Sequence, residues 1–264
     1  MDARSRKGLR IALLALAGMQ LIIGAGFLLR SGWALELWPW PDGPLSYRFV
    51  ASMLLAQGAT VAWIAYSLDM RAAQGGILGF ALANAGLCAF TALLYGERGG
   101  SVLLGWALVC GLLAFGSALL FRMSGRFPRD DPHPIPAFVR FSFLVFAGAL
   151  AVATVMLVMR ARVVFPWPLS AESSVMFGLL FLASAIYFFD GWLRPGRDNV
   201  AGQLIGFLVY DAVLIGPWLA HLPKTSGGFR ISMVIYLIVL GWSGVLALWY
   251  LLRGRSAMRM QVGI

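Results

Sequence analysis

IALLALAGMQLIIGAGFLL, residues 11–29, is an apolar stretch without a single charged side chain. About 20 mostly apolar residues in a helix are enough to cross the hydrocarbon core of a bilayer, which is about 30 Å thick. Four basic residues precede the stretch: Arg4, Arg6, Lys7 and Arg10. It is longer than the apolar region of a typical signal peptide, and no clear cleavage site with small residues follows it. We therefore predict a retained membrane-spanning helix.

Seven further apolar stretches of similar length follow the first one. They cover residues 49–68, 77–95, 101–121, 137–159, 173–189, 201–222 and 231–252. Proline, glycine and charged residues gather between them, as is typical of connections. The connection at residues 122–136 contains several prolines and predicts an extended linker. The sequence thus predicts an all-α, polytopic integral membrane protein with eight transmembrane helices.

The composition supports the same class of protein. Of the 264 residues, 60% are apolar and 12% are charged, whereas soluble domains have about 25% charged residues. The net charge of +10 would suggest a nucleic-acid partner in a soluble domain. Here the basic residues are scattered in small groups between the apolar stretches and form no continuous basic patch. We therefore exclude nucleic acid as a partner and expect the lipid bilayer instead.

The second organisational feature is an internal duplication at an offset of 127 residues. Four helices per copy is an even number, so both copies would enter the membrane from the same side, in parallel orientation. We predict two tandem four-helix repeats, residues 1–121 and 137–264, joined by the linker at residues 122–136. The matching positions are Pro39-Trp40-Pro41 with Pro166-Trp167-Pro168, Gly79-Phe80 with Gly206-Phe207, and Asn84 with Asp211.

The distribution of basic residues predicts the orientation in the membrane. Fourteen of the 21 Lys and Arg residues fall on the face that carries the N-terminus, the linker at residues 122–136 and the C-terminus. The other seven fall on the opposite face. Because short cytoplasmic loops are enriched in Lys and Arg, we predict that both termini are cytoplasmic. We expect the protein in the plasma (inner) membrane.

Two Trp-Pro elements lie on the predicted outer face: LWPWPDGPLS at residues 37–46 and VVFPWPLSAES at residues 163–173. Tryptophan favours the headgroup level of a bilayer, and proline favours an extended approach. One interpretation is a repeated interfacial turn that leads into the next helix. The alternative is an outer mouth or lid over a site between the repeats. The residues concerned are Trp38, Trp40 and Trp167, with Ser46 and Ser173 at the expected N-cap positions.

Asn84 and Asp211 are the leading candidates for a functional site, because each lies near the middle of its apolar stretch. A carboxylate at this depth costs a few kcal/mol at least, so it normally faces the bundle interior, a cavity or a partner. The two residues could hydrogen-bond across helices and hold the repeats together. Alternatively, Asp211 could bind a proton, a cation or a polar ligand in a central cavity. Tyr210 and Gln57 are additional polar candidates for this site.

Other residue types offer little chemistry. Cys88 and Cys110 lie inside apolar stretches, and His133 and His221 are predicted on opposite faces, so we expect no metal site. Asp190 with Arg194 predicts an ion pair at the cytoplasmic edge. No catalytic motif is present, and no pattern points to a particular cofactor.

Two hypotheses about function follow from these features. The first is the transport or binding of a small ligand or a proton at a polar site near the bilayer midplane, between the repeats. The second is a non-catalytic accessory subunit of a larger membrane complex, packed against other membrane subunits or further copies of this chain. An enzymatic role lacks a candidate nucleophile or metal site.

Overall fold

The computed structural model describes residues 3–40, 42–70, 72–125 and 135–261, and within these residues all regular structure is helical. Eight helices in this part of the chain are long and apolar enough to cross a membrane. The predicted all-α fold, with eight helices of membrane-spanning length and composition, is therefore confirmed for the described residues. The eight helices are α1 (Ala3–Leu28), α3 (Pro44–Ser67), α4 (Gln74–Arg98), α5 (Ser101–Ser124), α6 (Ala137–Val158), α7 (Ala171–Leu193), α8 (Arg197–His221) and α9 (Gly227–Gln261).

Most of these helices are longer than the apolar stretches that predict them. Helix α4, for example, ends at Arg98 rather than at residue 95, and α9 continues to Gln261. Hydropathy marks only the part of a helix inside the hydrocarbon, whereas backbone hydrogen bonding favours continuing the helix into the interface. Two short elements were not predicted: α2 (Gly32–Leu35) and the 3₁₀ helix η1 (Leu222–Lys224). Residues 126–134 of the predicted linker lie outside the described residues.

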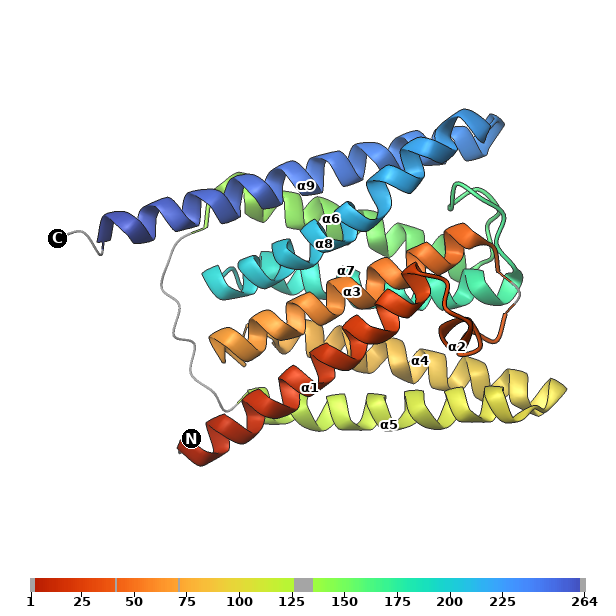
Figure 1. The fold of residues 1–264 in the computed structure, drawn as a ribbon, viewed down its shortest axis with the longest axis horizontal. Helices are drawn as coiled ribbons and strands as arrows, with labels where there is room; N and C mark the ends of the chain where they lie inside the picture. The colour runs from red at the N-terminus through yellow and green to blue at the C-terminus, as the bar shows by residue number, and fades with distance from the viewer. Residues whose placement is uncertain (1–2, 41, 71, 126–134, 262–264) are drawn as a thin grey trace.

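Four helices, α3, α4, α7 and α8, make the contacts that join the N-terminal half (α1–α5) to the C-terminal half (α6–α9). Helix α3 packs against α8, and α4 packs against α7. The remaining helices pack on these four: α1 on α3, α5 on α4, α6 on α7 and α9 on α8. In Figure 1, α5 and α9 lie on opposite sides of the bundle, and α1 begins at the same end at which α9 finishes.

Glycine allows close approach at both contacts between the halves. A Cβ atom added to Gly79 of α4 would lie only 2.4 Å from the carbonyl oxygen of Ala183 in α7. A Cβ atom on Gly206 of α8 would lie 2.7 Å from Oγ1 of Thr60 in α3 and 3.6 Å from the carbonyl oxygen of Ala56. Small residues at such positions are typical of membrane helices, where close packing drives association.

Aromatic rings fill the space between the two halves. Phe49 of α3 is fully buried, and its ring centroid lies 4.8 Å from that of Phe165 and 4.7 Å from that of Phe177. Phe181 of α7 stacks on Phe165 at 5.7 Å. The core therefore consists of interlocking rings contributed by both halves of the chain.

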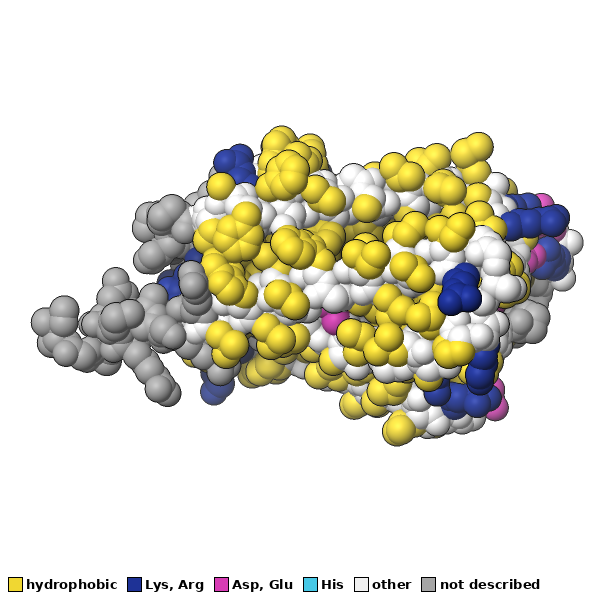
Figure 2. Space-filling view, turned by 90° about the horizontal axis from the view of Figure 1, so that it is seen from above, with side chains coloured by type: hydrophobic (Ala, Val, Ile, Leu, Met, Phe, Trp, Pro, Cys, Tyr) yellow, Lys and Arg dark blue, Asp and Glu magenta, His cyan; other side chains and the backbone are white. Residues whose placement is uncertain are grey.

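The outer surface of the bundle is strongly apolar. Exposed side chains of α9, such as Ile235, Ile238 and Val245, belong to this surface. Figure 2 shows the face on the α9 side: hydrophobic side chains cover most of its length, Lys and Arg gather toward its ends, and a small acidic spot appears near its middle. A surface of this kind is suited to contact with lipid rather than water.

Candidate functional site

Asp211 lies near the middle of α8 and is only 5% exposed. The hydroxyl group of Ser243 in α9 donates to its carboxylate, with Oγ 3.0 Å from Oδ1 and 2.9 Å from Oδ2. Gly244 lies beside the carboxylate, and a Cβ atom there would be in ordinary van der Waals contact with Oδ2, at 3.4 Å. Among the described residues, no Lys, Arg or His forms an ion pair with Asp211. The carboxylate thus occupies the seam between α8 and α9 with a serine as its hydrogen-bond donor.

The structure does not bring Asn84 to Asp211. Asn84 is buried in α4, and its Nδ2 donates to the carbonyl oxygen of Phe80 in the same helix, at 2.9 Å. No hydrogen bond joins the two residues in the part of the chain that the structure describes. The reason is the helix arrangement: across the halves, α4 packs mainly on α7, and α8 packs mainly on α3. A hydrogen bond between Asn84 and Asp211 therefore does not hold the halves together.

Neither Tyr210 nor Gln57 hydrogen-bonds to the Asp211 carboxylate within the described residues. The hydroxyl of Tyr210 hydrogen-bonds to that of Tyr236 in α9, and its ring packs edge-on against Phe49 at 6.2 Å. Tyr236 and Ser243 are two helical turns apart in α9, or about 10 Å. Gln57 is half-buried in α3 and makes no hydrogen bond within the described residues. Tyr210 therefore packs against the aromatic core and makes its own contact between α8 and α9, separate from the hydrogen bond between Asp211 and Ser243.

Each Trp-Pro element hydrogen-bonds to the half of the protein that contains the other element. The indole N–H of Trp167 donates to Oγ of Ser46 in α3, at 3.0 Å. In the other direction, the carboxylate of Asp42 accepts hydrogen bonds from Ser173 in α7 and from the indole of Trp38, the latter at 2.7 Å. We call these five residues the outer clasp, because they link the halves at one end of the bundle.

The tryptophans of these elements are buried inside the protein. Trp38, Trp40 and Trp167 are 7%, 5% and 6% exposed. Trp38 stacks on Phe177 of α7 with ring centroids 5.8 Å apart, and Trp40 packs edge-on against Trp106 of α5 at 6.0 Å. These rings cover one end of the aromatic core, so interfacial anchoring does not describe them fully.

Ser46 and Ser173 are not N-caps, which corrects the prediction from the sequence. The N-cap of α3 is Gly43, with Pro44 as the first helical residue. The N-cap of α7 is Ser170, whose side chain accepts a hydrogen bond from the backbone N–H of Ser173. Both N-caps lie three residues earlier than expected, and Ser46 and Ser173 instead hydrogen-bond across the halves.

Asp42 is half-buried in the loop that precedes α3. Burial raises the pKa of its carboxyl group above the ordinary value, because removal from water disfavours the charged form. The hydrogen bonds from Ser173 and Trp38 oppose this effect by stabilising the carboxylate. The protonation of Asp42 is therefore linked to its burial and to its hydrogen bonds in the outer clasp.

A second polar group lies toward the opposite end of the bundle. Asp190 of α7 is 5% exposed and forms an ion pair with Arg194, one turn further on. Nη1 of Arg194 also donates to Oε1 of Gln74 in α4, at 2.8 Å. A Cβ atom added to Gly75 would lie 2.2 Å from Cβ of Asp190, so the two helices meet closely here. The predicted ion pair exists, with Asp190 buried and the Arg194 side chain 32% exposed, and Arg194 links the pair to the N-terminal half through Gln74.

The hydrogen bonds continue into α8. We call the residues that they connect the inner network: Gln74, Asp190, Arg194, Asn199 and Gln203. Nδ2 of Asn199 lies 3.5 Å from Oδ2 of Asp190, and Nε2 of Gln203 donates to Oδ1 of Asn199 at 2.9 Å. Gln203 is almost fully buried, and its Oε1 has no hydrogen-bond donor within the described residues. The sequence predicted the pair of Asp190 with Arg194 in this network, but not the part played by Asn199 and Gln203.

Metal-ligating side chains do not gather in the described residues: no group of three His, Cys, Asp or Glu lies in one place. Cys88 and Cys110 are free thiols, and His221 is the last residue of α8. His133 falls outside the described residues. The seam at Asp211, the outer clasp and the inner network are therefore the polar features on which a function can be built.

Comparison of this chain with protein-family models, with curated proteins and with solved structures finds no match.

Proposed function

We propose that this integral membrane protein binds a proton or a small polar ligand at Asp211, and that it carries this ligand across the membrane. The observation that carries the proposal is a buried carboxylate near the middle of a membrane-spanning helix, with Ser243 as its donor and no cationic partner among the described residues. Such a position costs free energy, and ionisable residues at this depth typically serve ion or proton pathways.

The seam around Asp211 offers chemistry for both protonation states. When the carboxylate is charged, the hydroxyl of Ser243 can donate to it. When the carboxyl group is protonated, it can donate to Ser243, whose own proton then turns toward the carbonyl oxygen of Val239, 2.8 Å from Oγ. The hydroxyl of Ser243 can therefore remain a hydrogen-bond partner of the carboxyl group in both protonation states.

The proposed architecture is two tandem four-helix repeats in parallel orientation. Support comes from contacts at matching positions: Gly79 meets Ala183 across α4 and α7, while Gly206 meets Ala56 across α8 and α3. Each residue of the second contact corresponds to one of the first at an offset of 127 residues. In this scheme the site lies within the second repeat, at the seam between α8 and α9, and Asn84 is its uncharged counterpart in the first.

The orientation is part of the same proposal. The excess of basic residues on one face favours cytoplasmic N- and C-termini in the plasma membrane. With this orientation, the outer clasp faces away from the cytoplasm and the inner network faces toward it. Reporter fusions test the placement: a C-terminal reporter that is active only outside the cytoplasm should be inactive, and its activity would reverse the assignment.

An accessory role in a membrane complex is the second candidate. The observation that favours it is the filling of the space between the halves by Phe49, Phe165, Phe177 and Phe181, all of them buried. A dense aromatic core provides rigidity rather than a wide aqueous path. Under this alternative, Asp211 serves helix packing alone, and the protein has no flux of its own.

The test uses the purified full chain in liposomes that contain a pH-sensitive dye. An imposed pH gradient should collapse faster with the wild-type chain than in empty liposomes. Asp211→Asn should reduce the rate to that of empty liposomes, whereas Asn84→Ala should leave it unchanged. Wild-type liposomes that behave like empty ones, while the protein is folded and inserted, would rule out proton transport and favour the accessory role.

A further inference from the structure

A small pocket lies where the second Trp-Pro element meets the connection between α8 and α9. Its volume is about 150 Å³. The segment Pro166-Trp167-Pro168 supplies one part of its lining. The end of α8, the 3₁₀ helix η1 and the beginning of α9 supply the rest, namely His221, Lys224, Thr225, Ser226 and Phe229. We call this cavity the outer pocket, because it shares Trp167 with the outer clasp.

Three side chains of the outer pocket have hydrogen-bond donors that no other protein group uses. The ammonium group of Lys224 is a donor only, the hydroxyl of Ser226 can donate, and the imidazole of His221 has at least one ring N–H. Within the described residues, these side chains make no hydrogen bond and no ion pair. They are therefore available to a ligand that accepts hydrogen bonds.

The charge of the outer pocket is positive. Lys224 contributes a full charge, and none of the described residues that line the pocket is acidic. Two carboxylates at this end of the bundle have partners elsewhere: Asp42 accepts hydrogen bonds in the outer clasp, and Glu172 forms an ion pair with Arg98 at 2.7 Å. The pocket also lies at the beginning of α9, where the helix dipole adds to the positive potential. An anionic group is thus the ligand that this lining favours.

Contacts outside the pocket hold its lining in place. The indole N–H of Trp167 donates to Ser46, so Trp167 offers its apolar ring rather than its donor to a ligand. Trp218 packs edge-on against this ring, with centroids 5.0 Å apart. On the other strand of the lining, Thr225 is buried and its Oγ1 donates to the carbonyl oxygen of Leu222 at 2.8 Å. This hydrogen bond fixes the turn that carries Lys224.

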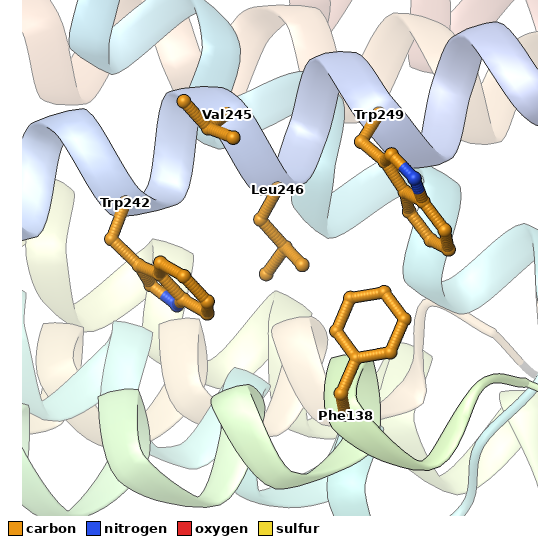
Figure 3. A pocket seen from close by; sticks show the side chains of 5 residues that line it. All are labelled: Phe138, Trp242, Val245, Leu246 and Trp249. Atoms are coloured by element: carbon orange, nitrogen blue, oxygen red, sulfur yellow. The ribbon is translucent and has the colours of Figure 1, made fainter.

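A larger hollow between α6 and α9 has a different lining. Its side chains, shown in Figure 3, are Phe138, Trp242, Val245, Leu246 and Trp249. None of them carries a charge, so this hollow offers no group that selects one ligand over another. The outer pocket differs because it combines a cation and free donors with the apolar rings of two aromatic residues.

We infer that the outer pocket binds a small organic anion, with its carboxylate held by Lys224 and Ser226 and its apolar part against Trp167 and Phe229. The volume of the pocket is below the roughly 300 Å³ at which sites for drug-sized ligands begin, so the ligand has few non-hydrogen atoms. An anionic lipid headgroup shares the charge but would place no apolar group against the two rings.

The outer pocket is separate from the proposed proton site. His221 follows Asp211 by ten residues, or about 15 Å along α8. Binding in the pocket therefore needs no proton transfer at Asp211, and the inference does not rest on transport.

The experiment is saturation-transfer NMR of the full chain in phosphatidylcholine nanodiscs, titrated with butyrate or with the uncharged butyramide of nearly the same size. Empty nanodiscs give the background from lipid. The wild-type chain should bind butyrate about ten-fold more tightly than butyramide, because charge-assisted hydrogen bonds are the stronger ones. Lys224→Gln should weaken butyrate binding by about the same factor, and Lys224→Arg should retain most of it. Lys7→Gln removes the other lysine of the chain, which is exposed on α1, and is the matched control.

The apolar part of the pocket is tested separately. Phe229→Ala should weaken the binding of butyrate, whereas Phe115→Ala, which alters an exposed ring on α5, should not. Equal binding of butyrate and butyramide, or equal losses in Lys224→Gln and Lys7→Gln, would overturn the inference. Loss of the butyrate signal when phosphatidylglycerol is added to the nanodiscs would overturn it in favour of a lipid headgroup.

Discussion

The indole N–H of Trp167 donates to Oγ of Ser46 across 121 residues of sequence, at 3.0 Å, and both side chains are buried. The bond joins the second Trp-Pro element to the helix that follows the first. Asp42 makes the reverse connection, from the first element to Ser173 of the C-terminal half. The two halves are therefore fastened reciprocally at the outer clasp.

Replacing Trp167 with phenylalanine tests the contribution of this bond. The variant keeps most of the apolar ring but removes the N–H, so Ser46 loses its donor in a buried setting. We expect the free energy of unfolding to fall by about 1–3 kcal/mol, measured as a lower melting temperature in detergent. Trp242→Phe, on the lipid-facing surface, is the control. Equal effects of the two changes would show that ring size matters and the bond does not.

The raised pKa of Asp42 predicts a pH dependence of stability. The folded state binds the proton more tightly than the unfolded state, so this contribution is fully present below the unfolded pKa. It is lost as the pH rises through the higher folded pKa. The wild-type chain should therefore gain melting temperature relative to Asp42→Asn as the pH is lowered from 7 toward 4. A difference in melting temperature between the two proteins that stays constant over that pH range would contradict the prediction.

The glycine contacts between the halves predict that alanine substitutions lower the free energy of unfolding by different amounts. Gly79→Ala would place Cβ 2.4 Å from the backbone carbonyl oxygen of Ala183, which cannot move without shifting α7. We expect a loss of about 1–3 kcal/mol in the free energy of unfolding. Gly206→Ala should cost less, because its nearest atom belongs to the Thr60 side chain.

Gly116→Ala is the matched control for this series, since a Cβ atom there would meet nothing within 4 Å. Chemical denaturation of each variant in the same detergent gives the comparison. Because alanine favours a helix over glycine, Gly116→Ala should leave stability unchanged or raise it. A destabilisation by Gly116→Ala as large as that by Gly79→Ala would contradict the close crossing as the cause.

The inner network predicts that removing one of its two charges destabilises the protein more than removing both. Arg194→Gln leaves the buried Asp190 carboxylate without its cation, which should cost about 3–5 kcal/mol. Asp190→Asn with Arg194→Gln removes both charges and should recover much of that loss. The melting temperatures of the two variants provide the comparison. A double variant that is less stable than the single one would contradict the claim that Arg194 neutralises a buried Asp190 carboxylate.

Hydropathy was sufficient to predict the eight helices, because the thickness of the bilayer sets their length and composition. It could not predict what the side chains contact. Asp211 was recognisable as a deep carboxylate, but its partner Ser243 depends on the rotation of α9 about its axis. The sequence carries no signal for that rotation apart from small residues at the seam.

The proposed duplication did not predict which side chains meet. Asn84 and Asp211 align at its offset of 127 residues, yet no hydrogen bond joins them within the described residues. The helix crossings instead bring Gly79 to Ala183 and Gly206 to Ala56. Likewise, Ser46 and Ser173 were assigned to helix caps, although their partners lie in the opposite half.

The most direct test of the proposed function is to observe the Asp211 carboxyl group itself. Infrared spectroscopy of the chain in lipid, recorded over a range of pH, resolves the stretching band of a protonated carboxyl group in an apolar environment. A band that disappears reversibly as the pH rises, and that is missing from Asp211→Asn but present in Asp190→Asn, is the predicted result. A band that is independent of pH would mean that Asp211 exchanges no proton, and would contradict the proposal.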